Sequence, residues 1–126
     1  SLSLAKAINK EITMKLPLIK NAIEQELDDT GVHPRALEGT SPSTAWLEIY
    51  EDNEGRDAGI WECTPGKYRL ERESDEMCYI LQGHWKLIGD DGDEYEVKTG
   101  DVLYLRKGWC GTSHVIETIR KVYMAC

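Results

Sequence analysis

Apolar and polar side chains alternate along most of the chain after residue 43, in short runs that are separated by turn-forming residues. An alternation with a period of two is typical of half-buried strands. The pattern predicts strands at residues 45–50, 59–63, 67–71, 76–82, 85–88, 94–97, 102–105 and 112–124. Because no helical pattern separates these strands, we expect an all-β fold, an antiparallel sandwich or barrel of the jelly-roll kind.

A helical pattern is confined to the N-terminal part of the chain. Apolar residues recur there at every fourth position among polar ones: Ile19, Ile23 and Leu27. This spacing places them on one face of a helix, so we predict a helix from Pro17 to Leu27, and a second helical stretch before the proline. The turn-forming residues 28–31 end the helix. We therefore expect an N-terminal helical segment, residues 1–31, and a barrel domain, residues 32–126.

The length and charge of the chain limit the functions that it can have. Its 126 residues fit one domain with a substantial core. With 15 basic and 23 acidic residues the formal net charge is -8, and such a surface repels phosphate backbones and anionic lipids. Neither nucleic acid nor a membrane is therefore an expected partner. The absence of a secretory signal pattern and of a long apolar run predicts a cytoplasmic location. The four cysteines show no C-x-x-C spacing, so we expect free thiols.

Two stretches of the chain carry a paired motif. In residues 66–83, GKYRLERESDEMCYILQG, a glycine opens a polar cluster, and Glu76 stands seven positions before Gly83. In residues 100–115, GDVLYLRKGWCGTSHV, Gly100 and Gly108 occupy the turns. The pair resembles the signature of the cupin superfamily. Three shorter stretches, GIWECTPGKYRLE, DEMCYILQG and ETIRKVY, resemble small single-domain cupins grouped with the cupin domains of ureidoglycine aminohydrolase and of ethanolamine-utilisation proteins.

The resemblance, which spans about residues 46–124, implies a cupin-type antiparallel jelly-roll barrel, often a homodimer, with a small-molecule pocket at one open end. It also implies a metal ion held by two histidines and a glutamate of the first motif and one histidine of the second. Aligning Glu76 with the motif glutamate places the other three ligand positions at Arg69, Glu71 and Gly111. Because arginine has no lone pair to donate and repels a cation, we expect no metal cofactor. An irregular site built from Glu71, Glu76 and Cys78 remains the alternative.

Strand alternation gives a list of pocket residues. If Glu76 faces inward, its neighbours at every second position do too, and Arg69 shares one face with Glu71. The predicted catalytic residues are Glu71, Glu76 and Tyr104, and the predicted ligand-binding residues are Arg69, Cys78, Gln82, Ser113 and Trp61. Two confined carboxylates can share one proton and act as an acid/base pair, while Arg69 holds a substrate carboxylate. An internal salt-bridge network that contacts no ligand is the other interpretation of these three charges.

Three functions stay open at this point. The first is a metal-free cupin that binds, or acts on, a small polar metabolite. The second is a metal-dependent cupin enzyme of the aminohydrolase or isomerase kind. The third is a non-catalytic module that forms a homodimer through its N-terminal segment and a strand edge.

Overall fold

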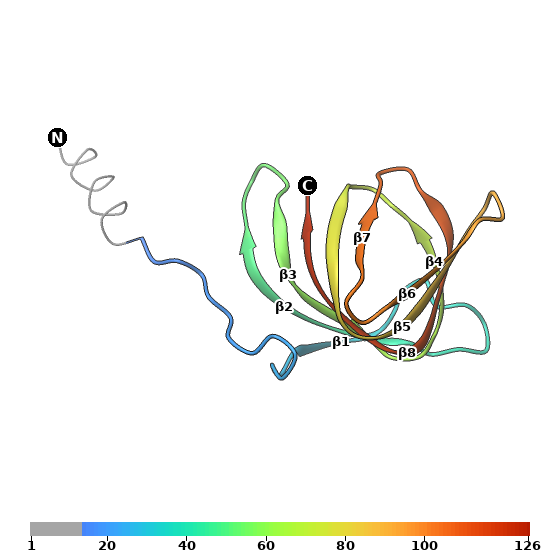
Figure 1. Cartoon of the computed structure of the whole chain (residues 1–126), viewed down its shortest axis with the longest axis horizontal. Helices are drawn as coiled ribbons and strands as arrows, with labels where there is room; N and C mark the ends of the chain where they lie inside the picture. The colour runs from blue at the N-terminus through green and yellow to red at the C-terminus, as the bar shows by residue number, and fades with distance from the viewer. Residues whose placement is uncertain (1–13) are drawn as a thin grey trace.

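A computed structural model describes residues 14–126, which form one antiparallel sheet folded over on itself (Figure 1). The strands of this part of the chain are β1 (Asp28–Val32), β2 (Ser43–Glu51), β3 (Asp57–Cys63), β4 (Gly66–Glu71), β5 (Glu76–Gly89), β6 (Glu94–Lys98), β7 (Val102–Leu105) and β8 (Cys110–Ala125). The predicted all-β antiparallel architecture is confirmed. β1 has no counterpart among the predicted strands, since its sequence, DDTGV, carries no apolar alternation.

Two long strands, β5 and β8, run through the whole molecule. They pair with each other from Glu76 opposite Ala125 to Gly89 opposite Gly111. At one end they carry β7 and the group β3, β2 and β1, and at the other end they carry β6 and β4. The two ends curl toward each other and enclose the core (Figure 1). Among the described residues the outermost strands do not pair with one another, so the sheet is an open roll rather than a closed barrel.

A bend at Gly83 makes the roll possible. The sequence predicts separate strands at residues 76–82 and 85–88, but β5 is continuous and its pairing with β8 slips around Gln82 and His84. Gly83 has a φ of 109°, and a Cβ there would lie 2.2 Å from the carbonyl oxygen of Thr118 in β8. Only glycine allows this backbone angle and this close approach of two strands.

The core fills the space between the two ends of the sheet. Side chains from β3, β4, β5, β6, β7 and β8 meet there, and several are fully buried: Cys63, Ile80, Trp85, Leu87, Val115 and Ile119. Burial of β5 alternates up to the bend, because successive side chains of a strand point to opposite faces. The alternation therefore determines which residues of β5 face the core before the bend.

The predicted helix from Pro17 to Leu27 is wrong. Residues 14–27 are irregular, with one turn in which the Glu24 amide donates to the carbonyl of Asn21. The carbonyls of residues 22, 23 and 25 accept hydrogen bonds at 2.8–2.9 Å from Nη1 of Arg120, which is 8% exposed. A tertiary contact thus replaces the helical hydrogen bonds. The stretch expected before Pro17 lies mostly outside the described residues.

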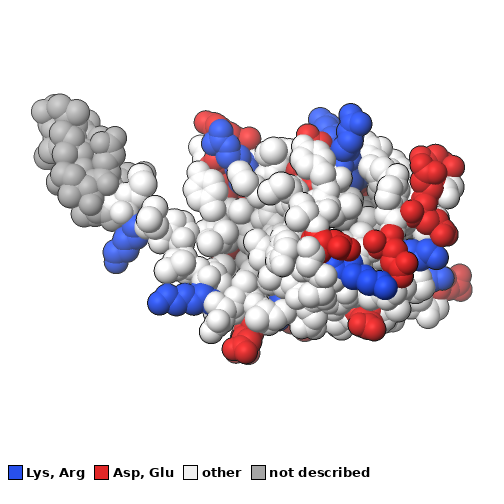
Figure 2. All heavy atoms as spheres, in the orientation of Figure 1, with Lys and Arg blue, Asp and Glu red and all other residues white. Residues whose placement is uncertain are grey.

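The surface carries both signs of charge. Figure 2 shows acidic and basic side chains interspersed over the face in view. Residues 14–126 contain no helix that is long and apolar enough to cross a membrane.

Candidate functional site

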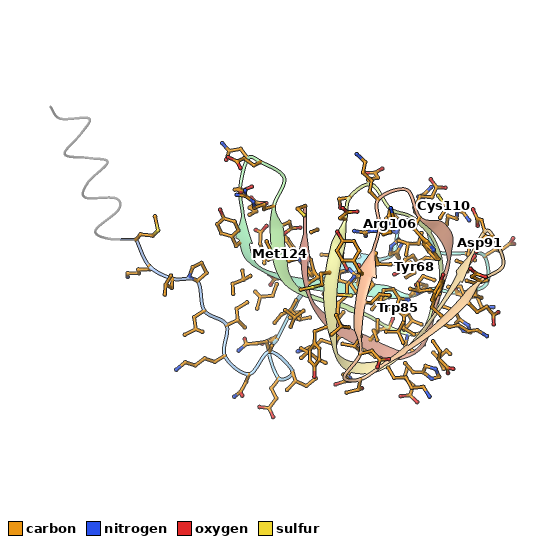
Figure 3. The ribbon with its side chains drawn as sticks, turned by 45° about the horizontal axis from the view of Figure 1, so that its top comes forward. Tyr68, Trp85, Asp91, Arg106, Cys110 and Met124 are labelled. Carbon is orange, nitrogen blue, oxygen red and sulfur yellow. The ribbon has the colours of Figure 1, made fainter. Side chains whose placement is uncertain are left out.

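The folded sheet leaves a cavity of about 510 Å³ between its two ends. Five tryptophan and tyrosine side chains line it: Trp46, Trp61, Tyr68, Trp85 and Tyr123. Tyr68 and Trp85 point into the interior of the roll in Figure 3. A concave, mostly aromatic cavity of this size suits a small organic molecule.

A charged cluster lies within this cavity. Glu76, the first residue of β5, is 6% exposed, and its Oε2 contacts the ammonium of Lys121 from β8. Its Oε1 lies 3.3 Å from Nη2 of Arg72, which follows β4. Two cations therefore share one carboxylate in a largely desolvated place.

Aromatic rings surround the Lys121 ammonium as well. Its Nζ lies 4.7 Å from the ring centre of Trp61, 5.3 Å from that of Trp85 and 5.9 Å from that of Tyr123. Trp61 is directly opposite Lys121 in the β3–β8 pairing. The faces of aromatic rings attract cations, so the rings and Glu76 together hold the ammonium in place.

Hydrogen bonds fix the orientation of the rings. Trp85 Nε1 donates to the hydroxyl of Ser113, which is fully buried. The Tyr123 hydroxyl accepts from Trp46 Nε1 and donates to the carboxylate of Asp57 at 3.2 Å. Burial raises the pKa of Tyr123 above its ordinary value, so the phenol is neutral near neutral pH.

One side of the cavity is covered by a loop that follows β1. The ring of His33 stacks on Tyr68 with 3.8 Å between the ring centres and 18° between the planes. His33 Nδ1 accepts a hydrogen bond from the Arg35 amide, and burial lowers the pKa of the imidazole. Burial also raises the pKa of the Tyr68 hydroxyl, against the opposing effect of a hydrogen bond with Ser113.

The donor set of the cavity does not fit a divalent metal ion. Within residues 14–126, no three His, Cys, Asp or Glu side chains come together in a way that could hold a metal. The motif carboxylate of Glu76 is already shared by Lys121 and Arg72, and both cations would repel a metal ion.

Two predicted site residues lie outside the cavity because β4 has the opposite phase to the one expected. Tyr68 and Leu70 line the cavity, whereas Arg69 and Glu71 point to the outer surface. Arg69 holds Asp90 with two hydrogen bonds of 2.6 Å and lies 3.3 Å from Glu71. These contacts lower the pKa of both carboxyl groups. Glu71 and Glu76 thus do not face each other as predicted, and the inward positions on the side of Glu76 are Leu70 and Arg72.

Three further predicted residues also lie outside the cavity lining. Cys78 is buried in the core, where burial raises the pKa of its thiol to about 11. Gln82 is exposed because the pairing of β5 slips between Ile80 and this residue. Tyr104 is 56% exposed on the outer face, and a hydrogen bond with Asp75 raises the pKa of its phenol.

The structure does bring three of the predicted residues together. Glu76 and Trp61 line the cavity, and Ser113 lies directly behind it as the partner of Trp85. Arg72, Lys121 and Tyr123 line the cavity but are not among the residues predicted from the sequence. The signal for Lys121 and Tyr123 was present, since both share the phase of Ser113 along β8. A lysine in an apolar strand at an inward position is unusual enough to mark a site.

Comparison with protein-family models matches residues 51–123 to the EutQ-like cupin domain. The chain belongs to this family. The match runs from the last residue of β2 into β8 and includes Glu76, Arg72 and Lys121, so the predicted kinship with small cupins of the ethanolamine-utilisation group is confirmed. Curated protein sequences give no match.

Solved structures show the same fold. The EutQ protein of Clostridium difficile aligns with a TM-score of 0.59 and 17% identity, over 67% of this cupin and 62% of its own chain. A putative ethanolamine utilization protein Q from Salmonella typhimurium aligns with a TM-score of 0.61 and 22% identity, over 75% and 76% of the two chains. A protein of unknown function from Pseudomonas syringae pv. tomato aligns with a TM-score of 0.73 and 20% identity, over 82% of this cupin and 45% of its own chain. At such identities the likeness concerns the fold.

Proposed function

We propose that this EutQ-like cupin binds a small polar metabolite in the aromatic cavity and does so without the usual cupin metal. Glu76, Lys121 and Arg72 make the polar contacts, and the tryptophan and tyrosine rings cover the apolar part of the molecule. The observation that carries the proposal is the buried Glu76–Lys121 pair inside a cavity of about 510 Å³.

The energetics of a buried ion pair support a binding role. Removing an ammonium and a carboxylate from water costs several kcal/mol per ion, and well-packed apolar residues in their place are often equally or more stabilising. Lys121 and Glu76 are each 7% exposed in their side chains. A pair of this kind is a poor device for stability alone, whereas a ligand gains from charges that are already desolvated and oriented.

The cavity walls support the same proposal. Trp61, Trp85 and Tyr123 are held by the ammonium and by hydrogen bonds, so a ligand meets surfaces that are already in place. Preorganised walls lower the entropic cost of binding. Mostly apolar walls with a few convergent polar groups are the usual composition of a small-molecule site.

A thermal-shift screen of amino acids, ureides, sugar acids, amines and neutral metabolites tests the proposal. We expect at least one compound to raise the melting temperature, with an affinity that differs at least about tenfold between the wild type and Glu76→Gln, equivalent to about 1.4 kcal/mol, because the substitution changes the charge of the cluster. The matched control is Glu71→Gln, which makes the same chemical change on the outer surface and should leave the affinity unchanged.

A steric variant keeps the test decisive if Glu76→Gln fails to fold. Ser74 lines the cavity in the connection between β4 and β5, outside any strand, so Ser74→Trp fills part of the cavity without altering the sheet. Binding should be lost in this variant. A compound that binds Glu76→Gln and Ser74→Trp as well as it binds the wild type would place its site elsewhere and refute the proposal.

A further inference from the structure

The charges inside the cavity point to a particular class of ligand. We infer, on the basis of the proposed function, that the cavity selects a carboxylate, held by the Arg72 guanidinium and the Lys121 ammonium. The class would then be small organic acids with a flat or apolar body, and the positive charge of the site would come from the chain itself rather than from a bound cation.

The first support is the charge balance. Arg72 and Lys121 both contact the same carboxylate, that of Glu76, so this cluster has a formal charge of plus one. The other acidic residue of the cavity, Asp57, balances this excess over the cavity as a whole, but its carboxylate contacts the Tyr123 hydroxyl, at 3.2 Å and 3.3 Å from its two oxygens, and not the two cations. An added carboxylate neutralises the excess charge at the cluster, and in a place of low dielectric this attraction is strong.

The second support is the incomplete hydrogen bonding of Arg72. Its Nε is buried and has no hydrogen-bond partner among the described residues. Its Nη2 reaches Glu76 and Ser74 only at 3.3 Å and 3.4 Å, which are long distances for charged partners. A buried N–H without a partner destabilises the protein, and a ligand oxygen at this guanidinium removes that cost.

The third support is that Arg72 is held in position before a ligand arrives. Its amide donates to the carbonyl of Trp109 at 2.9 Å, and its own carbonyl accepts from the amide of Gly108 at 2.9 Å. The backbone on both sides of this residue is thus fixed by the turn before β8. A guanidinium on a backbone that is already fixed loses less entropy when it binds a carboxylate through two parallel hydrogen bonds.

The aromatic walls define the rest of the ligand. Rings of Trp46, Trp61, Tyr68 and Trp85 line the cavity, and none of them carries a charge that would repel an organic acid. A flat or apolar body can pack on these faces while the acid group reaches Arg72 and Lys121. Polyanions such as nucleotides are a poorer match, because the cluster holds a single excess positive charge.

Nuclear magnetic resonance with matched probes tests the inference. The probes are benzoate with benzamide and phenylacetate with phenylacetamide, since the two members of each pair share a shape and differ in charge. The readout is the indole N–H signals of Trp46, Trp61 and Trp85, which line the cavity, with Trp109, which does not line it, as the internal reference. We expect the acids to shift the three cavity signals and to bind at least about tenfold more tightly than the amides.

Variants identify the cations responsible. Arg72→Gln and Lys121→Met should each remove most of the preference for acid over amide, and amide binding in the same variants shows that the cavity is intact. Arg35→Gln is the matched control, because this substitution removes the same charge at the outer surface, beside Glu71. If Lys121→Met does not fold, Arg72→Gln alone decides the matter.

Each result has a definite consequence. Equal binding of acids and amides at the cavity signals would overturn the inference and leave the proposed function standing. A preference for acids that survives in both charge variants would overturn the assignment to Arg72 and Lys121. Cavity signals that respond to none of the four probes would also overturn the inference, and the separate metabolite screen would then decide the proposed function.

Discussion

Lys121 lies on β8 at a position that faces the interior, in the series of every second residue that points inward. Its alternate neighbours are Ile119 and Tyr123. A charge at such a position is tolerated because Glu76 and three aromatic rings surround it. Removing Glu76 alone would leave an uncompensated buried ammonium, which is far more costly than replacing the whole pair.

His33 gives a pH-dependent contribution to stability. Its pKa in the folded protein lies below the ordinary value of 6.5, because burial disfavours the charged ring, with a smaller effect of Arg35. As the pH falls, the unfolded chain takes up a proton at this residue before the folded chain does, so acidification favours unfolding. Protonation also removes the acceptor that Nδ1 offers to the Arg35 amide.

We therefore expect the free energy of unfolding to fall between about pH 7 and about pH 5, and to fall less steeply in His33→Asn. Asparagine keeps an acceptor near the Arg35 amide and does not titrate. Urea denaturation at several pH values measures both slopes. Acidic residues and His114, whose pKa is also lowered by burial, contribute equally to both proteins. Identical slopes in the two proteins would contradict the role given to His33.

At the level of single residues, the sequence predicted the site only where the strand phase was known. Counting from Glu76 placed Cys78 on the correct inward face, but the count failed at Gln82, where the pairing of β5 slips. In β4 the phase was taken from the motif alignment and was off by one position. Arg69 and Glu71 were therefore predicted to face inward, whereas Leu70 and the following Arg72 line the cavity. A slip of one residue moves every side chain of a strand to the other face.

Gly83 is the element-level feature on which the roll depends. Alanine at this position meets both a left-handed backbone angle and the β8 backbone, with Thr118 O at 2.2 Å and Ile119 Cα at 2.8 Å. Gly92, in the turn between β5 and β6, has a φ of 91° and nothing within 4 Å of a new Cβ. A comparison of alanine substitutions at the two glycines therefore distinguishes the cost of the backbone angle from the cost of the steric conflict.

Gly92→Ala should lower the free energy of unfolding by about 1 kcal/mol, the cost of the backbone angle alone. Gly83→Ala should lower it by at least about 2 kcal/mol more, because β5 and β8 must move apart. Urea denaturation of the two variants measures the difference. Equal losses would mean that the close approach at the bend contributes little.

The N-terminal segment shows where local pattern fails for an element. Ile19, Ile23 and Leu27 have helical spacing, yet residues 14–27 are irregular. Arg120 donates to three carbonyls of this segment and also binds Glu62 at 3.0 Å. A short amphipathic helix has little stability by itself. The hydrogen bonds from Arg120, which is far away in the sequence, therefore determine the backbone conformation of this segment.

On the scale of the whole molecule, the outer face of β5, β7 and β8 carries an apolar patch. The strand register arranges it in two rows: Tyr104, Met77 and Met124 in one, and Val102, Tyr79 and Val122 in the other. All six side chains are at least 38% exposed. An exposed apolar patch with regular rows is typical of a protein interface.

We propose that the homodimer expected from the family resemblance buries this patch, rather than the N-terminal segment. Size-exclusion chromatography with light scattering should then give the mass of two chains for the wild type and of one chain for Tyr79→Lys. Val32→Lys is the control, since Val32 is 54% exposed on β1, outside the patch. A wild-type monomer, or a Tyr79→Lys dimer as stable as the wild type, would contradict the proposal.

The central place of β8 has a consequence for biosynthesis. β3, β4 and β5 all pair with this strand, and all three are translated before it. The pairs β2–β3, β5–β6 and β5–β7 can form earlier, but neither end of the sheet is complete until residues 110–125 have left the ribosome. Until β8 emerges, β3, β4 and β5 therefore display open edges on the nascent chain, and the native arrangement of the sheet depends on the arrival of this one strand.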